Sequence, residues 1–259
     1  MAVKLHSTAR GKGPPVVLLH GLFGSGSNLG ALSRALQDSF TVYSVDLPNH
    51  GDSDWLEDAD LGSTAGAVGD WLSHQGLAPA QFVGHSLGGK VAMQLALAQP
   101  EKVAALVAAD IAPVAYPPHH DAVFAALDAV AAAQCPARQA AAEIMGRHLQ
   151  EEQVIQFLLS NLRRDDRGIY RWRFNLEGLK RGYTAVRAEP TGHRAFPGPV
   201  LFIKGGDSDY IRAEHRSRIL SLFPAAEMKI MPGCGHWLHV QRPSLFNSLV
   251  RRFLRDALP

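Results

Sequence analysis

The chain has 259 residues, of which 46% are hydrophobic and 19% are charged, and its formal net charge is +2 with neutral histidines. These values are ordinary for a globular protein, and they exclude a disordered chain and the strongly basic surface that nucleic-acid binding requires. Two cysteines, Cys135 and Cys234, are too few for a disulfide framework, and no ligand spacing suggests a metal site. The first ten residues lack the apolar segment of a signal peptide, and no apolar run could span a bilayer, so we expect a cytoplasmic protein.

Short apolar runs typical of buried strands alternate with helical patterns along most of the chain. The strand-like runs are residues 16–20, 41–45, 81–83, 103–109, 200–204 and 227–231. The helical patterns are residues 29–37, 63–74, 90–99, 213–222 and 244–256. This alternation predicts the α/β class, with a mostly parallel sheet covered by helices on both faces.

Residues 112–199 break this rhythm because they contain no convincing buried strand. They contain Ala-rich, amphipathic stretches and then an aromatic and basic segment, at residues 121–133, 136–149, 151–164 and 170–183. Such an insertion is too long for a structureless loop, so we predict a helical cap over the carboxyl edge of the sheet, where open α/β sheets bind ligands. We expect one folding unit, with residues 1–111 and 197–259 as the α/β core and residues 112–196 as the cap.

Five arginines gather in this insertion, and we interpret them as a solvated helix face rather than as an anion site. They are Arg163, Arg164, Arg167, Arg171 and Arg173.

The strongest catalytic signal is Ser86, which stands between Gly84 and Gly88 after an apolar run and before an Ala/Leu-rich helical stretch. In a nucleophile elbow, a sharp strand-to-helix turn lifts a serine Oγ clear of the sheet, and its strained backbone leaves no room for side chains two residues away on either side. The motif and its context therefore predict that Ser86 is a nucleophile.

A serine hydroxyl is a poor nucleophile until a base removes its proton. Among twelve histidines, His236 is the best candidate because it follows the last strand-like run in a loop where Gly233 and Gly235 permit a tight turn. His239 is the near competitor and lacks the glycine flanks. We interpret His20 and His85, which flank the turns of the expected site, as hydrogen-bond partners of their loops.

The oxyanion of an acyl-transfer reaction requires two preorganised backbone N–H groups. Leu87, directly after the nucleophile, supplies the first. We expect the second from Leu22, in the loop after the first strand-like run, with Phe23 as the adjacent alternative.

The acid that orients the base is less defined. The loop of residues 205–210 contains Asp207, Ser208 and Asp209, and the three could carry this role or frame it.

Together these motifs resemble the α/β-hydrolase superfamily, and within it they look like the YbfF-type branch of small bacterial esterases and thioesterases. The resemblance covers nearly the full length, at residues 20–24, 46–53, 84–89, 110–113, 172–176, 205–211 and 233–237. The first three segments are common to the superfamily, and those around Asp110 and Trp172 are more specific to the branch.

The resemblance changes the expected acid. In the familiar superfamily spacing the acid stands at the position of Ser208, 28 residues before His236, and a hydroxyl cannot stabilise an imidazolium as a carboxylate does. The branch instead uses an aspartate after the strand that follows the nucleophile helix, which corresponds to Asp110. The resemblance thus implies Asp110 as the acid and Ser208 as an assistant of His236. Asp207 and Asp209 remain alternatives.

We therefore predict a serine hydrolase that cleaves small-molecule carboxylic esters, with acyl-CoA thioesters as a further substrate class, and that needs no metal or organic cofactor. The apolar cap residues that we expect to face the acyl pocket are Phe124, Leu127, Phe157, Leu158 and Trp172. The alternatives are a carbon–carbon bond hydrolase or perhydrolase of the same fold, or a non-catalytic ligand-sensing protein.

Overall fold

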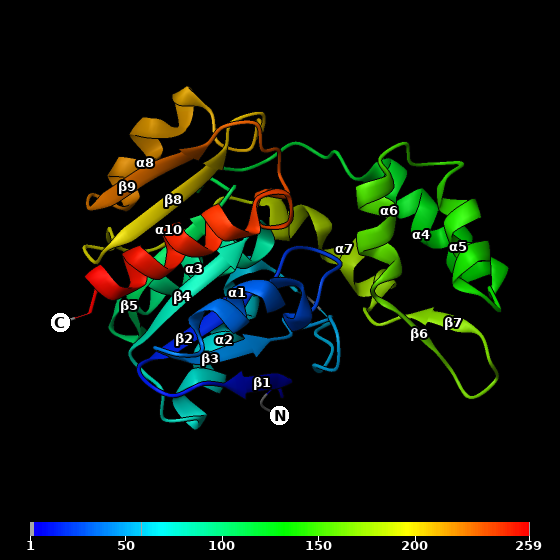
Figure 1. Cartoon of the computed structure of the whole chain (residues 1–259), viewed down its shortest axis with the longest axis horizontal. Coiled ribbons are helices and arrows are strands. Elements are labelled where there is room, and N and C mark those ends of the chain that lie inside the picture. Colours follow the sequence, from blue (N-terminus) through cyan, green and yellow to red (C-terminus); the bar gives the residue numbers. More distant parts are fainter. Residues whose placement is uncertain (1–2, 58, 259) are drawn as a thin grey trace.

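The computed structural model describes residues 3–57 and 59–258. Its centre is a seven-stranded sheet of order β1-β3-β2-β4-β5-β8-β9 (Figure 1). The strands are β1 (Ser7–Arg10), β2 (Pro15–Leu19), β3 (Thr41–Val45), β4 (Ala80–His85), β5 (Val103–Ala109), β8 (Val200–Gly205) and β9 (Ala226–Met231). All neighbours in this sheet pair in parallel except β1 and β3, so the predicted mostly parallel sheet is confirmed.

Both faces of the sheet are covered, because successive side chains of a strand point to opposite sides. On one face, Val16 and Leu18 of β2 belong to the same apolar cluster as α1 (Gly30–Leu36) and α10 (Pro243–Asp256). On the other face, Val17 and Leu19 pack in a cluster with α2 (Leu61–His74) and α3 (Leu87–Ala98). This double burial explains why the central strands read as continuous apolar runs.

The remaining elements of the core are short. They are the helices α8 (Arg216–Leu222) and α9 (Leu238–Gln241) and the 3₁₀ helices Gly26–Leu29, Pro100–Lys102 and Ala213–His215. None of the helices in the described residues is both long and apolar enough to cross a membrane.

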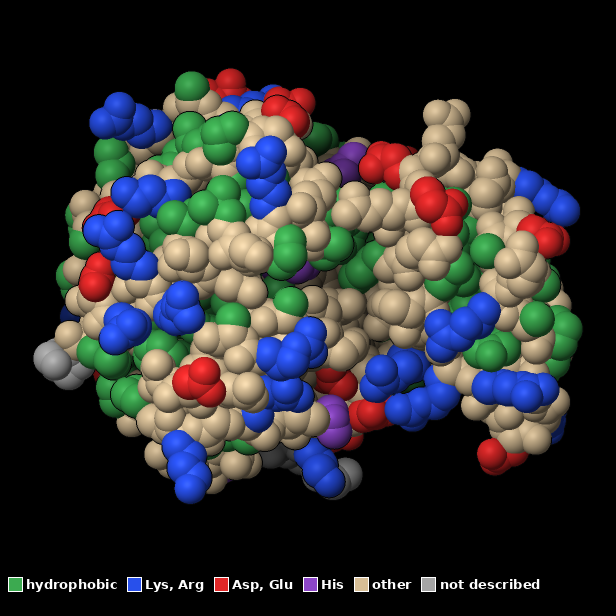
Figure 2. Space-filling view, viewed as in Figure 1, with side chains coloured by type: hydrophobic (Ala, Val, Ile, Leu, Met, Phe, Trp, Pro, Cys, Tyr) green, Lys and Arg blue, Asp and Glu red, His purple; other side chains and the backbone are tan. Residues whose placement is uncertain are grey.

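The segment between β5 and β8, which we call the cap, lies beside the core at the right of Figure 1, and the surface is hollowed where the two meet (Figure 2). Its elements are α4 (Asp121–Ala133), α5 (Arg138–Met145), α6 (Glu152–Leu159), β6 (Leu162–Arg164), β7 (Tyr170–Trp172) and α7 (Leu176–Arg187). The three predicted helical stretches contain α4, α5 and α6. The division of the chain into core and cap at residues 112 and 196 stays a prediction.

The strands β6 and β7 are short and mostly exposed, so they agree with the expectation that the insertion has no buried strand. They do correct the third predicted helical stretch, which ends at Leu159 and does not continue to Arg164. The carboxylate of Asp165 accepts hydrogen bonds from the backbone N–H groups of Arg167 and Ile169, and Gly168 has a φ of +80°. These features form the tight turn of an antiparallel hairpin. A further helix, α7, starts where the side chain of Asn175 accepts from the N–H of Gly178.

The arginine cluster therefore lies mainly on this hairpin and not on a helix. Arg163 and Arg173 both form ion pairs with Asp52 of the core, and Arg171 pairs with Asp165. Because these charges are paired within the chain, the structure favours an internal use of the cluster over an anion site.

Two side chains of α3 fasten both ends of the cap to the core. The buried Lys90 donates from Nζ to the carbonyl oxygens of Val114 at 3.0 Å and Arg187 at 2.7 Å. Gln94 exchanges two hydrogen bonds of 2.8 Å with the backbone of Thr191. The entry to the cap and the exit from it are thus held on the helix that begins after Ser86.

Candidate active site

Ser86 lies in a strained turn between β4 and α3, with φ 52° and ψ −117°. The two glycines around it are required by close backbone contacts. A Cβ atom on Gly84 would lie 2.3 Å from the carbonyl carbon of Gly88, and one on Gly88 would lie 2.2 Å from the carbonyl oxygen of Leu19. The predicted elbow geometry is confirmed, and it presents Ser86 at the carboxyl edge of the sheet.

Asp110 follows β5 at the same edge and is completely buried. Its Oδ2 lies 2.8 Å from Nδ1 of His236 and accepts the hydroxyl of Ser208 at 2.5 Å. Its Oδ1 accepts the N–H of Gly205 at 2.9 Å. Three donors thus surround this carboxylate and fix its position.

The bond to Asp110 sets the protonation pattern of His236. When Nδ1 donates to the carboxylate, the neutral ring has its lone pair at Nε2, where a base must accept a proton. Ser86 and His236 line the same cavity. Within residues 3–57 and 59–258 the hydroxyl of Ser86 has no hydrogen-bond partner.

Asp207 and Asp209, the alternative acids, are both exposed. Their loop is held by backbone contacts, with the N–H of Asp207 donating to the carbonyl of Cys234 and Arg212 donating to the carbonyl of Asp209. In the described part of the chain neither carboxylate is bonded to His236. The structure therefore brings Asp110, and not these two, to the imidazole.

The backbone N–H groups of Leu22 and Leu87 have no acceptor among the described residues, and both residues border a cavity that reaches Ser86. The N–H of Phe23, by contrast, donates to Nε2 of His50 at 3.1 Å. Because that donor is already used, the alternative role of Phe23 in an oxyanion hole is not supported. The available pair is Leu22 and Leu87.

Two buried histidines fix the loop that carries Leu22. His20 accepts the N–H of Leu47 at Nε2 and bonds the carbonyl of Gly21 through Nδ1. His50 accepts from Phe23 in the same way and bonds the carbonyl of Pro48. Burial lowers the pKa of His20 to about 4 and that of His50 to about 3, so both rings are neutral and can accept. The predicted loop-bonding role of His20 is confirmed.

Comparison with known proteins decides the family. A model of the alpha/beta hydrolase family matches residues 16–249. The chain belongs to the α/β-hydrolase family. Esterase YbfF of Escherichia coli (strain K12) is 40% identical over 246 residues, which cover 93% of both chains. The resemblance to the YbfF-type branch, and with it the α/β-hydrolase fold class, is confirmed.

Two further similarities extend over most of this α/β-hydrolase. The sn-1-specific diacylglycerol lipase ABHD11 of Mus musculus is 38% identical over 249 residues, which cover 93% of this chain and 81% of the lipase. A solved structure described as a marine microorganism esterase has a TM-score of 0.94 at 34% identity and covers 97% of this chain and 99% of its own.

Further rings enclose the imidazole of this α/β-hydrolase, and one of them, Tyr210, was not assigned to the site from the sequence. Tyr210 stacks on His236 with ring centroids 3.9 Å apart and an interplanar angle of 17°. Its hydroxyl lies 2.6 Å from Nε2 of His119, a residue of the cap. On another side, His85 donates from Nε2 to the carbonyl of His236, which confirms the predicted loop-bonding role of His85. The contact of Tyr210 with His119 joins a core loop to the cap, and no periodic pattern in the sequence could have predicted it.

The predicted acyl-pocket residues divide into two groups. Phe157 and Leu158 of α6 line the cavity that contains Ser86 and His236. Phe124, Leu127 and Trp172 do not line this cavity, so the expectation was wrong for these three. Leu127 is fully buried, Trp172 donates to its carbonyl, and Phe124 packs edge-on against the ring of Tyr183. Leu127 thus belongs to the interior of the cap, Trp172 is half-buried over it, and Phe124 also packs against Phe23 of the core.

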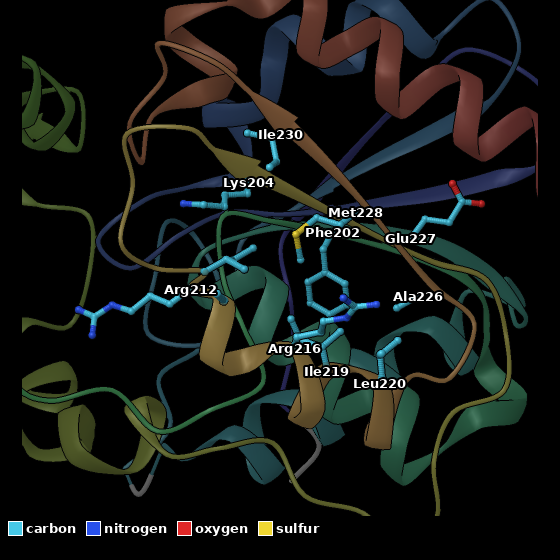
Figure 3. A pocket seen from close by; sticks show the side chains of 12 residues that line it. Phe202, Lys204, Arg212, Arg216, Ile219, Leu220, Ala226, Glu227, Met228 and Ile230 are labelled. Carbon is cyan, nitrogen blue, oxygen red and sulfur yellow. The ribbon is translucent and has the colours of Figure 1, made fainter.

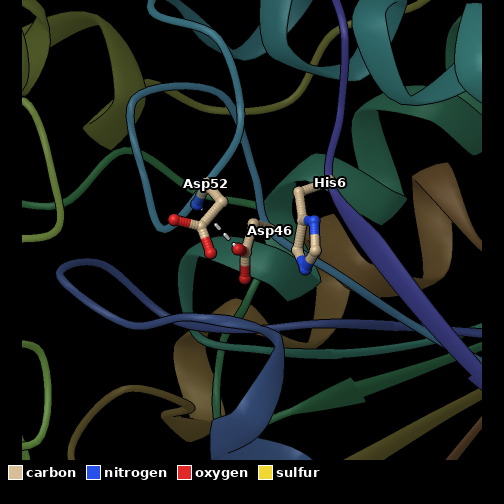
Figure 4. Close-up of side chains that lie close together, drawn as sticks. All are labelled: His6, Asp46 and Asp52. Atoms are coloured by element: carbon tan, nitrogen blue, oxygen red, sulfur yellow. Dashed lines mark hydrogen bonds between the residues drawn. The ribbon is translucent and has the colours of Figure 1, made fainter.

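Among the described residues, His6, Asp46 and Asp52 form a group whose possible metal-ligand atoms lie within 4.8 Å of one another (Figure 4). Asp46 already accepts the N–H groups of Gly26 at 2.6 Å and Asp52 at 2.9 Å. Asp52 is neutralised by Arg163 and Arg173. The cluster therefore braces the turn after β3, and its carboxylate oxygen atoms are bonded to protein partners.

A larger cavity, of about 480 Å³, lies between β9 and α8 (Figure 3). Its wall is apolar with basic residues, including Phe202, Lys204 and Arg216, and it contains neither Ser86 nor His236. A substrate there would not reach the nucleophile, so the smaller cavities at Ser86 are the candidate active site of this α/β-hydrolase.

Proposed function

We propose that this protein is a serine esterase that hydrolyses small-molecule carboxylic esters through an acyl-enzyme on Ser86. The observation that carries the proposal is the Asp110–His236 contact behind a strained serine elbow in one cavity. Relatives that are named esterases or lipases, at 38–40% identity, support the ester as the substrate class.

In the proposed first half-reaction, Oγ of Ser86 attacks the ester carbonyl carbon while Nε2 of His236 takes the hydroxyl proton. The negative charge moves to the carbonyl oxygen, where the N–H groups of Leu22 and Leu87 stabilise it. The tetrahedral intermediate collapses, the bond to the alcohol oxygen breaks, and His236 returns its proton to the leaving alcohol.

In the second half-reaction, water attacks the acyl-enzyme carbonyl and gives a proton to His236. Collapse of the second intermediate releases the carboxylic acid and restores the serine hydroxyl. Throughout, Asp110 stabilises the imidazolium and Ser208 holds the carboxylate in place. The same steps apply to an acyl-CoA thioester, which stays a predicted substrate class, as the cytoplasmic location stays a prediction from the sequence.

Labelling with a fluorophosphonate probe and hydrolysis of p-nitrophenyl esters test the proposal together. We expect covalent labelling at Ser86 in the wild type and none in Ser86→Ala. Loss of the nucleophile should lower kcat by about 10⁶-fold with the fold intact. A folded Ser86→Ala variant that retained more than about a tenth of the wild-type kcat would contradict Ser86 as the nucleophile.

A further inference from the structure

Two cavities meet at Ser86, and they differ in size. The larger measures about 240 Å³ and the smaller about 40 Å³. Five residues line both: Leu22, Ser86, His119, His120 and Tyr210. A substrate whose carbonyl carbon lies at Ser86 can therefore extend one part into each cavity.

The chemistry of the proposed reaction indicates which cavity binds the leaving group and which binds the acyl chain. The leaving oxygen or sulfur must receive a proton from His236, so the group attached to it starts beside that ring. His236 and Trp237 line only the larger cavity, whereas Leu87 and Ile111 line only the smaller one. The carbonyl oxygen points to the N–H groups of Leu22 and Leu87. With the leaving group in the larger cavity, the acyl chain extends into the smaller one.

From these observations we infer that this enzyme selects a short acyl group, bound in the smaller cavity, on a large apolar alcohol or thiol, bound in the larger one. This inference rests on the proposed function. It also reassigns Phe157 and Leu158, which the sequence placed at the acyl chain, to the leaving group.

The size of the smaller cavity sets the acyl length. The smaller cavity, at about 40 Å³, has about a sixth of the volume of the larger one, so it suits the smaller part of the substrate. We expect an acetyl, propionyl or butyryl group to bind there more readily than an octanoyl group.

The wall of the smaller cavity is cross-linked by partly buried hydrogen bonds. Lys90 is 3% exposed and bonds two carbonyl oxygens of the cap. The hydroxyl of Tyr116 donates to the carbonyl of Tyr210 at 2.6 Å and accepts the N–H of Ala112 at 2.8 Å. The hydroxyl of Tyr183 lies 2.6 Å from Nδ1 of His120. Widening the cavity would break these bonds, so its wall resists a longer acyl chain.

The larger cavity offers a wide apolar surface to the leaving group. The cap contributes Val123, Val154, Phe157 and Leu158 to its wall, and the core contributes Trp237. The ring of Phe157 contacts that of Trp237, with centroids 4.4 Å apart. This wall suits an alkyl or aromatic group.

Two substrate series on the wild-type enzyme test the inference. The first is p-nitrophenyl acetate, butyrate, octanoate and dodecanoate, and the second is ethyl, hexyl and 3-phenylpropyl acetate, whose alcohols have similar acidity. We expect kcat/KM to fall at least tenfold from butyrate to octanoate and to rise at least tenfold from ethyl to 3-phenylpropyl acetate. A kcat/KM for octanoate equal to or above that for butyrate would overturn the inference.

A matched pair of valines separates the cavities. Val186 of α7 lines only the smaller cavity and Val154 of α6 only the larger one. Val186→Ala should raise the octanoate-to-butyrate ratio of kcat/KM at least fivefold, and Val154→Ala should leave that ratio within twofold. If Val154→Ala raised this ratio and Val186→Ala left it unchanged, the inference would be overturned and the esterase function would stand. Absence of both ester hydrolysis and fluorophosphonate labelling would instead refute the proposed function, and the inference with it.

Discussion

The hydroxyl of Ser208 lies 2.5 Å from Oδ2 of Asp110, the same carboxylate oxygen that pairs with His236. Ser208 also accepts the N–H of Tyr210 at 3.2 Å, so its hydroxyl connects the carboxylate to the loop whose tyrosine stacks on the imidazole. A serine at this position therefore holds the acid in place without acting as the acid.

Ser208→Ala should lower kcat about tenfold, because a hydrogen bond to a charged group contributes about 1.5–3 kcal/mol while Asp110 keeps its bonds to His236 and Gly205. Ser217→Ala, at an exposed position of α8, is the control and should leave kcat unchanged. Hydrolysis of p-nitrophenyl butyrate by purified variants gives the comparison. A Ser208→Ala enzyme with wild-type kcat would show that the hydroxyl does not assist.

Gly88→Ala should prevent folding or cost about 3 kcal/mol or more of the free energy of unfolding, because the new Cβ would meet backbone oxygens of Leu19 and His20. Gly66→Ala is the matched control, since a Cβ there has no neighbour within 4 Å and Gly66 lies inside α2. We expect it to stabilise the protein by about 0.5–1 kcal/mol. Urea unfolding monitored by circular dichroism measures both, and a stable Gly88→Ala variant would contradict the elbow geometry.

The strands buried on both faces could be predicted from the sequence because their apolar runs are continuous. Strand β1 was missed because three of its four residues, Ser7–Arg10, are polar and all four are half or fully exposed at the sheet edge. The β6–β7 hairpin was missed because its turn depends on the Asp165 carboxylate and on Gly168, and not on an apolar pattern.

The candidate site was predictable where a local motif carries the geometry, as at Ser86 and His236. Asp110 lies 126 residues from His236, and strand order alone brings them together, so only the family resemblance indicated it. The apolar spacing of Phe124, Leu127 and Trp172 could not distinguish the interior of the cap from the wall of a cavity. Tyr210 and His119 meet through the docking of the cap, which no local pattern encodes.

Acid should destabilise the protein through its buried histidines. Burial holds the pKa of His50 at about 3, while the unfolded chain binds a proton near the ordinary value of 6.5. The unfolded state therefore carries more protons between these values, and the free energy of unfolding falls as pH decreases from about 6.5, with about 1.4 kcal/mol per pH unit from His50 alone.

His50→Gln should make this decline less steep by about 1.4 kcal/mol per pH unit, because glutamine takes up no proton and its Oε1 can still accept from Phe23. Urea unfolding at several pH values between 7 and 4.5 measures the slope. Identical slopes for the variant and the wild type would show that His50 is not held neutral by burial.

The most direct test of the proposed site is the kcat of Asp110→Asn beside those of Asp207→Asn and Asp209→Asn, with p-nitrophenyl butyrate as substrate and circular dichroism as the folding control. Asparagine keeps the side-chain size but removes the charge and favours the wrong imidazole tautomer, so kcat of Asp110→Asn should fall about 10⁴-fold. The two exposed loop positions should retain kcat within about threefold of the wild type. A folded Asp110→Asn enzyme that kept most of its kcat, while Asp207→Asn or Asp209→Asn lost it, would contradict Asp110 as the acid.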